Sequence, residues 1–262
     1  MNHQAKKKYG QNFLRDKNLL MKIVRLSDIE HKHVLEVGPG QGALTSFLAE
    51  QAADVVCYEI DQSLKPILDA LEDQYPNLKI IYEDFMDADL SSLSDELHVV
   101  ANVPYYITTP ILFKILETKS IVSASLMIQK EVLERLLAKP GSPSYNALSI
   151  VLQYHAEASK MMDVKRHMFY PIPNVDSAVI RLVKRKNGLI EKEYETRFLK
   201  LVKEAFRQKR KTLTNNWHEA FDVPKPVLES FLISQGYMSN VRAEQLSMDD
   251  FIKMARVWSY YD

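Results

Sequence analysis

The stretch HVLEVGPGQGALTSFLAEQ, residues 33–51, gives the strongest indication of the fold. Its first five residues are largely apolar and predict a buried strand, and a helix is predicted from Ala43 to about Gln51. Between them lies a glycine loop, Gly38–Gly42, whose glycines let the backbone approach a ligand at the carboxyl end of the strand. This order of strand, glycine loop and helix is typical of the nucleotide-binding opening of a Rossmann-like α/β sheet.

The glycine spacing and two later acids indicate which nucleotide is bound. The loop has the spacing G-x-G-x-G rather than the dinucleotide form G-x-G-x-x-G, which disfavours NAD and suits S-adenosylmethionine, a cofactor without a pyrophosphate. A second strand, Asp54–Ile60, carries Glu59, which is placed to accept hydrogen bonds from both ribose hydroxyls. A third strand, Leu78–Tyr82, is followed by Asp84, a candidate acceptor for the adenine amino group.

A fourth apolar strand, Leu97–Ala101, leads into Asn102-Val103-Pro104-Tyr105. Pro104 forces Val103 into an extended conformation, so the Val103 carbonyl and the Asn102 side-chain oxygen become two acceptors for one amino group. Tyr105 is suited to stack on an aromatic base. Together these groups suit chemistry on the exocyclic nitrogen of adenine, although the same four residues also suit a plain proline turn after a buried strand.

The remaining patterns extend the sheet and then end it. A fifth strand is expected at Ile121–Ile128, and a hairpin of strands is expected at Ala158–Val164 and Ala178–Val183. Beyond residue 187 only helical patterns follow. We therefore expect an α/β catalytic domain, residues 1–186, and a small all-helical C-terminal domain, residues 187–262.

Phe169 precedes two stiff prolines in the segment 169–177, FYPIPNVDS. One interpretation is that its ring covers the second face of a base stacked on Tyr105. The other is an aromatic side chain packed at the entrance of a strand.

Charge is unevenly distributed although the net charge is zero. Residues 1–25 carry seven basic side chains against one acid, and residues 160–214 carry fifteen against six. Residues 26–159 carry eight against twenty, so basic segments flank an acidic module and a polyanion is the natural partner. The basic residues that we expect to bind RNA are Arg207, Lys209, Arg210 and Lys211.

Several classes of protein are disfavoured by what the sequence lacks. No apolar run approaches a membrane span, and the first eight residues lack the apolar stretch of a signal peptide, so we expect a cytoplasmic protein without a membrane partner. Cys57 is the single cysteine and lies in an apolar run, so we interpret it as a core residue. No Cys/His set has metal-ligand spacing, so no metal is expected.

Taken in order, the motifs resemble the family of small-subunit ribosomal RNA adenine N6-dimethyltransferases over nearly the whole length. They are Gly10-Gln-Asn-Phe-Leu14, Glu36-Val-Gly-Pro-Gly40, Tyr58-Glu-Ile-Asp61, Glu83-Asp-Phe85, Asn102-Val-Pro-Tyr105, Gln129-Lys-Glu131, Lys139-Pro-Gly141, Phe169-Tyr-Pro-Ile-Pro173, Val175-Asp-Ser177 and Phe206-Arg-Gln-Lys-Arg-Lys-Thr-Leu213. Val103 stands where leucine is more usual, which matters little because its backbone carbonyl carries the proposed role.

The resemblance implies a class I S-adenosylmethionine-dependent methyltransferase that dimethylates two adjacent adenosines near the 3′ end of small-subunit (16S) rRNA. It further implies a role in small-subunit biogenesis, and we expect a monomer acting on rRNA within an assembling subunit. By the same resemblance the basic N-terminal segment, residues 1–25, closes over the cofactor. Tyr105 and Phe169 would sandwich the flipped target base. The residues that would hold the cofactor are Asn12, Leu14, Gly38, Glu59, Asp84 and Asn102.

Three other functions stay open at this point. The first is the antibiotic-resistance branch of the same superfamily, which dimethylates an adenine in large-subunit rRNA; the Lys139–Gly141 and Phe206–Leu213 segments disfavour it. The second is an RNA-binding protein with the methyltransferase fold but without catalysis, which would not need the glycine loop, Glu59 and Asn102 together. The third is an NAD-dependent dehydrogenase, which the glycine spacing disfavours.

Overall fold

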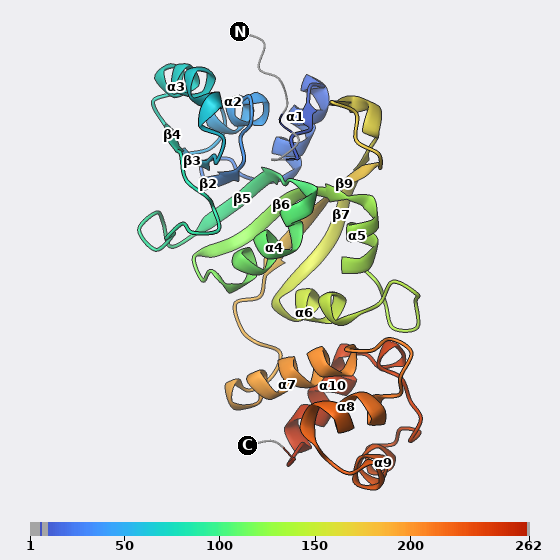
Figure 1. The fold of residues 1–262 in the computed structure, drawn as a ribbon. Helices are drawn as coiled ribbons and strands as arrows, with labels where there is room; N and C mark the ends of the chain where they lie inside the picture. Colours follow the sequence, from blue (N-terminus) through green and yellow to red (C-terminus); the bar gives the residue numbers. More distant parts are fainter. Residues whose placement is uncertain (1–5, 7–9, 261–262) are drawn as a thin grey trace. The chain divides into compact units, whose positions relative to one another are not determined.

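A computed structural model describes residue 6 and residues 10–260. Lys7 and Lys8 of the basic N-terminal segment therefore lie outside the described residues. By their contacts, the residues group into two compact units, which Figure 1 shows as a ribbon. Unit 1 comprises Met1–Leu133 and Ala158–Lys184, and unit 2 comprises Glu134–Glu157 and Arg185–Asp262. The predicted domain boundary at residue 187 lies close to the break after Lys184, whereas Glu134–Glu157 groups with the C-terminal helices.

Unit 1 is built on a seven-stranded sheet of order β4-β3-β2-β5-β6-β9-β7. The strands are β2 (His33–Val37), β3 (Asp54–Tyr58), β4 (Leu78–Ile81), β5 (Leu97–Asn102), β6 (Ile121–Gln129), β7 (Ala156–Val164) and β9 (Ser177–Lys184). The five neighbouring strands β4, β3, β2, β5 and β6 run parallel to one another, and β9 is antiparallel to β6. The predicted Rossmann-like sheet and the pairing of the last two long strands are confirmed.

The order of the strands creates a switch point between β2 and β5. From β2 the chain builds outward through β3 to β4, and it then returns to place β5 on the other side of β2. The loops that follow β2 and β5 therefore lead away from each other at the carboxyl edge of the sheet. This is the place where open α/β sheets bind their ligands.

Helices complete unit 1 and bury apolar side chains against the sheet. They are α1 (Lys17–Leu26), α2 (Ala43–Ala49), α3 (Lys65–Gln74) and α4 (Thr108–Glu117), with 3-10 turns η2 (Gln62–Leu64), η3 (Tyr105–Ile107) and η4 (Arg166–Met168). Asp16 caps α1 by accepting the Leu19 N–H at 2.9 Å, as its sequence position predicts. Cys57 is completely buried in this core, as predicted.

The start of α4 is not capped by a side chain. Thr108 and Thr109 are of a residue type that commonly caps helices, but the N-cap residue is Ile107. The 3-10 turn η3 continues directly into α4, and the Thr108 hydroxyl donates back toward the Pro104 and Tyr105 carbonyls, at 3.3 Å each. Pro110 lies in the first turn of α4.

A second, two-stranded sheet joins distant parts of unit 1. Strand β1 (Phe13–Leu14) pairs antiparallel with β8 (Phe169–Tyr170), with Phe13 opposite Tyr170 and Leu14 opposite Phe169. Two-residue strands leave no periodic pattern in a sequence, so this pairing could not be predicted from the sequence. It ties the N-terminal segment to the proline-rich stretch before β9.

Unit 2 contains helices around an aromatic core. They are α6 (Ala147–His155), α7 (Lys192–Ala205), α8 (Leu213–Phe221), α9 (Lys225–Ser234) and α10 (Met248–Val257), with η5 (Ala243–Gln245), and α5 (Lys130–Leu136) crosses the break between the units. Trp217 is completely buried, donates its indole N–H to the Leu201 carbonyl at 3.1 Å, and meets the Trp258 ring edge-on with centroids 4.9 Å apart. Helix α8, which carries Trp217, was not predicted individually, although Thr212 caps it.

Replacing Trp217 by Ala should lower the free energy of unfolding of unit 2 by about 3–5 kcal/mol, because a large buried ring is lost and a cavity remains. Native-state hydrogen exchange of the amides in α8 and α10 measures this loss. The matched control is Met238→Ala, since the Met238 side chain is 67% exposed and its truncation should change little. A loss below about 1 kcal/mol for the Trp217 variant would contradict the assigned core.

Candidate active site

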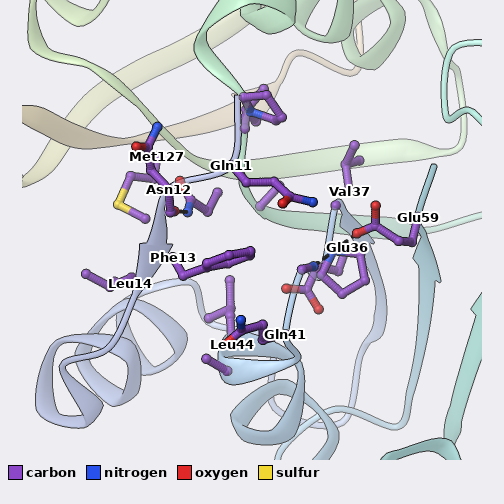
Figure 2. A pocket seen from close by; sticks show the side chains of 18 of the residues that line it. Gln11, Asn12, Phe13, Leu14, Glu36, Val37, Gln41, Leu44, Glu59 and Met127 are labelled. Atoms are coloured by element: carbon purple, nitrogen blue, oxygen red, sulfur yellow. Dashed lines mark hydrogen bonds between the residues drawn. The ribbon is translucent and has the colours of Figure 1, made fainter. Parts of the chain in front are cut away.

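A cavity of about 590 Å³ opens at the carboxyl edge of the sheet in unit 1. This volume is in the range of small-molecule sites. Figure 2 shows it between the N-terminal segment and the ends of β2 and β3. All six predicted cofactor residues line it, namely Asn12, Leu14, Gly38, Glu59, Asp84 and Asn102, and so do Val103 and Tyr105. The fold therefore brings together residues from five predicted segments.

The glycine loop forms one wall of the cavity in a backbone conformation that favours glycine. Gly38 and Gly40 have φ angles of +69° and +58°. A Cβ atom on Gly40 would lie 2.9 Å from the Phe13 ring, whereas one on Gly38 would meet nothing within 4 Å. Gly40 thus lets Phe13 approach the loop, and Gly38 borders open space that a ligand can fill.

Glu59 connects the glycine loop to the end of β3. Its carboxylate accepts the Gly40 N–H at 3.1 Å and the Asp61 N–H at 2.8 Å. The side chain is only 4% exposed, and this burial raises its pKa above the usual value. A carboxylate oxygen can accept more than one hydrogen bond, so Glu59 can also accept hydrogen bonds from ribose hydroxyls in the cavity.

The N-terminal segment is anchored next to Glu59 through Asp61. Lys6 donates to the Asp61 carboxylate at 2.7 Å, and Gln11 donates to its other oxygen at 3.0 Å. Although burial opposes ionisation, the hydrogen bonds from Lys6, Ser63 and Gln11 lower the pKa of Asp61 to about 2. The anchor is therefore a charged contact at neutral pH, and it holds the segment across the cavity.

Asn102 is oriented by the same segment. Its side-chain amide donates to the Asn12 carbonyl at 2.9 Å, a contact between residues 90 positions apart in the chain. The donor side of the Asn102 amide is thus engaged, which leaves the Oδ1 atom as an acceptor. The neighbouring Val103 N–H donates to the Met127 carbonyl at 3.2 Å, so Val103 is held against β6.

Tyr105 is held by Ser177, which belongs to a quoted motif but was not predicted as a site residue. The Tyr105 hydroxyl shares a 2.6 Å hydrogen bond with the hydroxyl of Ser177, at the start of β9. Ser177 is completely buried. Burial raises the pKa of Tyr105, although the Ser177 hydrogen bond opposes the rise. The phenol therefore stays neutral and its ring is fixed from behind.

Asp84 and Phe169 lie differently with respect to the cavity. Asp84 accepts the Met86 N–H at 2.9 Å and lines the cavity beside Phe85. Phe169 is 3% exposed, belongs to the apolar core with Leu14, and is not among the described residues that line the cavity. The structure thus brings Tyr105 to the cavity but not Phe169, and a base between the two rings remains a prediction.

The predicted RNA-binding residues lie in unit 2, on the segment between α7 and α8. Lys209 donates to the Pro143 carbonyl at 2.7 Å, and Lys211 is paired with Glu219. Arg207 lies 3.8 Å from Glu204, whereas Arg210 is exposed. This cluster is therefore partly tied to its own unit.

Two further residues of the cavity, Phe13 and Glu36, belong to quoted motifs but were not predicted as site residues. Phe13 extends its ring from β1 into the cavity, toward the side of Glu36 (Figure 2). Glu36 is 1% exposed, lines the cavity and accepts a hydrogen bond from the Cys57 thiol at 3.5 Å. Burial raises the pKa of Glu36 to about 7. Its place in a motif and near the end of a buried strand were the signals that could have found it.

Neither a metal-ligand cluster nor a membrane-spanning helix is found in the described part of the chain. Within residues 6 and 10–260, no group of three or more His, Cys, Asp or Glu side chains is arranged to hold a metal ion. Over the same residues, the helices are too short or too polar to cross a bilayer.

Comparison with solved structures defines the class of protein. A crystal structure of the 23S rRNA methyltransferase ErmE is similar with a TM-score of 0.76 and 27% identity, covering 94% of this chain and 98% of that one. A dimethyladenosine transferase from Plasmodium falciparum is similar with a TM-score of 0.77 and 25% identity, covering 92% of this chain and 95% of that one. The fold is therefore that of a class I methyltransferase with C-terminal helices.

The sequence comparisons then give the family. The family model described as ribosomal RNA adenine dimethylase matches residues 2–259, and the chain belongs to this family. A ribosomal RNA small subunit methyltransferase A from Aster yellows witches'-broom phytoplasma is 47% identical over 98% of this chain and 97% of its own. The protein of the same name from Lactococcus lactis is 43% identical over 95% of this chain and 88% of its own. The predicted family is confirmed.

The raised pKa of Glu36 predicts a pH-dependent stability. The pKa is about 7 in the folded protein against an ordinary 4.5, so the folded state binds more protons than the unfolded state between these values. Stability from this group is therefore present below about pH 4.5 and is lost as the pH rises to about 7, by about 3 kcal/mol in total.

Glu36→Gln should remove this loss. The unfolding free energy of the variant minus that of wild type should therefore increase between pH 5 and pH 8. Urea unfolding of both proteins across this range measures the difference. Glu117→Gln, at an exposed position of α4, is the control and should follow wild type. Equal pH dependence of wild type and Glu36→Gln would contradict the assignment.

The hydrogen bond between Tyr105 and Ser177 predicts a non-additive pair. Tyr105→Phe and Ser177→Ala each remove the same bond, so each should lower kcat for methyl transfer to RNA about two- to tenfold. The kcat of the double variant should be no lower than that of the less active single variant. Ser123→Ala removes a different buried serine, bonded to His98, and should leave kcat unchanged. Fully multiplicative losses in the double variant would show that the two groups act separately.

Proposed function

We propose that this chain transfers methyl groups from S-adenosylmethionine to N6 of two adjacent adenosines near the 3′ end of small-subunit (16S) rRNA. The observation that carries the proposal is the Asn102 side chain, which lines the cavity with its amide donor held by the Asn12 carbonyl. The choice of small-subunit RNA is supported by 43–47% identity to relatives named for that subunit, against 27% for the 23S rRNA methyltransferase.

The residues of the cavity suit the cofactor. Glu59 would receive the ribose hydroxyls, Asp84 the adenine amino group, and the open space at Gly38 would admit the ligand backbone. Asn12 and Leu14 would lie against the methionine end. Carboxylates line the cavity, which suits a cationic sulfonium ligand. S-adenosylmethionine, when bound, supplies an electrophilic methyl group.

Asn102 and Val103 would position the target amine. The exocyclic nitrogen of adenine is a weak nucleophile because its lone pair is delocalised into the ring. Accepting both of its N–H bonds, by the Asn102 Oδ1 atom and the Val103 carbonyl, favours a pyramidal nitrogen whose lone pair is available for transfer. Asn102 is neutral, which is sufficient because the nitrogen can lose its proton after the transfer.

Tyr105 and Phe169 would hold the base itself. Base stacking on Tyr105 would use a ring whose hydroxyl is fixed by Ser177. A second stack on Phe169 would require that ring to leave the core in which it is 3% exposed. Stacking on Tyr105 therefore requires less movement of side chains than stacking on Phe169.

The wider surface would engage the RNA by charge. Arg207, Lys209, Arg210 and Lys211 would contact phosphates from unit 2, and the basic N-terminal segment would do so from unit 1. We infer that the substrate is rRNA within an assembling small subunit, which makes the protein a cytoplasmic factor of subunit biogenesis that acts as a monomer without a membrane partner.

The function is tested by methyl transfer from labelled S-adenosylmethionine to purified small subunits that lack the modification, with nucleosides identified by mass spectrometry. Wild type should produce N6,N6-dimethyladenosine in small subunits and none in large subunits. Asn102→Ala should lower kcat at least about a hundredfold, because the group that positions the amine is lost. Asn77→Ala is a matched control, since Asn77 donates to two carbonyls away from the cavity.

Label in large subunits would instead assign the resistance-type activity on large-subunit rRNA. An absence of transfer by wild type, together with tight RNA binding, would assign a binding protein without catalysis. Full activity of Asn102→Ala would contradict the role given to Asn102 while leaving the substrate assignment intact.

A further inference from the structure

The pairing of β1 with β8 sorts four side chains onto two faces. Directly opposite residues of an antiparallel pair share a face, and successive residues alternate. Leu14 and Phe169 are opposite one another and are both buried, at 4% and 3% exposure. Phe13 and Tyr170 form the other pair. Phe13 and Leu14 both line the cavity, so β1 borders it, and of the two β8 residues only Tyr170 is exposed.

Tyr170 is an exposed aromatic residue with a cation on its ring. Its side chain is 56% exposed, and the Arg15 guanidinium lies 4.2 Å from the ring centroid. Arg15 is exposed and belongs to the cavity lining, whereas Tyr170 is not among the described lining residues. The pair thus stands at the rim of the cavity and not within it. An exposed ring of this kind, assembled with a guanidinium, is a stacking platform for a nucleobase.

The charge around the platform matches a nucleic acid. Lys17 is exposed and lines the cavity beside Arg15, and Arg166 is exposed on the turn that precedes β8. The nearby acids are engaged within the protein, since Asp16 caps α1 and Asp176 accepts from Lys165 and the Arg166 backbone. A phosphate next to a stacked base would therefore meet cations at this rim.

We propose that Tyr170 and Arg15 form a second base-binding position, which holds an unpaired nucleobase adjacent to the target adenosine. The proposal rests on the proposed function and extends it. Because the target amine must reach Asn102 inside the cavity, a base held at the rim is the neighbour of the target and not the target itself. A substrate with two adjacent adenosines presents such a neighbour, and stacking it would hold the strand while the target enters.

The test compares Tyr170→Ala with Tyr170→Phe in methyl transfer to small subunits. Tyr170→Ala should raise KM for the subunits about tenfold or more, because one base stack is lost, while the Kd for S-adenosylmethionine and the melting temperature stay at the wild-type values. Tyr170→Phe keeps the ring and should retain the wild-type KM. Arg15→Ala should also raise KM for the subunits. Val183→Ala and Lys160→Ala, at exposed positions of β9 and β7, are the controls.

A direct readout uses a short RNA in which 2-aminopurine replaces the adenosine next to the target. Stacking on Tyr170 should quench its fluorescence in wild type and in Tyr170→Phe, and the quenching should be lost in Tyr170→Ala. An unchanged KM and unchanged quenching in Tyr170→Ala, with wild type active on small subunits, would overturn this proposal alone. Inactivity of wild type on small subunits would instead overturn the proposed function on which it rests.

Discussion

The strand order at the centre of the sheet governs where this protein can bind a ligand. Strands β2 and β5 are neighbours, but the chain reaches β5 only after it has built β3 and β4 on the far side of β2. The loops after β2 and β5 consequently diverge and leave a cavity between them. The glycine loop, Gly38–Gly42, follows β2 directly, and the Asn102–Tyr105 stretch begins at the last residue of β5, so both border this cavity. The candidate cofactor residue Gly38 and the candidate acceptor Asn102 therefore stand at the ends of neighbouring strands.

The N-terminal segment completes the cavity by contacts at both sides. Near Glu59, Gln11 and Lys6 donate hydrogen bonds to the Asp61 carboxylate, and the backbone N–H of Asp61 donates to the Glu59 carboxylate. Toward the acceptor side, the Asn12 carbonyl orients Asn102. A single short segment thus contacts the groups assigned to ribose and to the target amine. Since these contacts are hydrogen bonds between polar groups at partial burial, they orient side chains more than they stabilise the fold.

Local patterns were sufficient for the elements of the sheet and for the residues at its carboxyl edge. Buried strands leave apolar runs, the glycine loop leaves a spacing, and Glu59 and Asn102 stand at the carboxyl ends of their strands, so their meeting at one edge could be predicted before any contact was known. The cap of α4 could not, because η3 took over the start of that helix. Helix α8 escaped individual prediction, since a basic cluster precedes it and its apolar residues are few.

Neighbouring residues and the order of motifs were enough to predict the sheet, the glycine loop, the candidate cofactor residues and the family. Which aromatic side chain of the stretch 169–170 is buried and which is exposed could be found only in the assembled fold. That choice depends on the register between β1 and β8, and a shift by one residue would exchange Phe169 and Tyr170. The register is set by the burial of Leu14 and Phe169 in a core assembled from the whole of unit 1, which no local pattern contains.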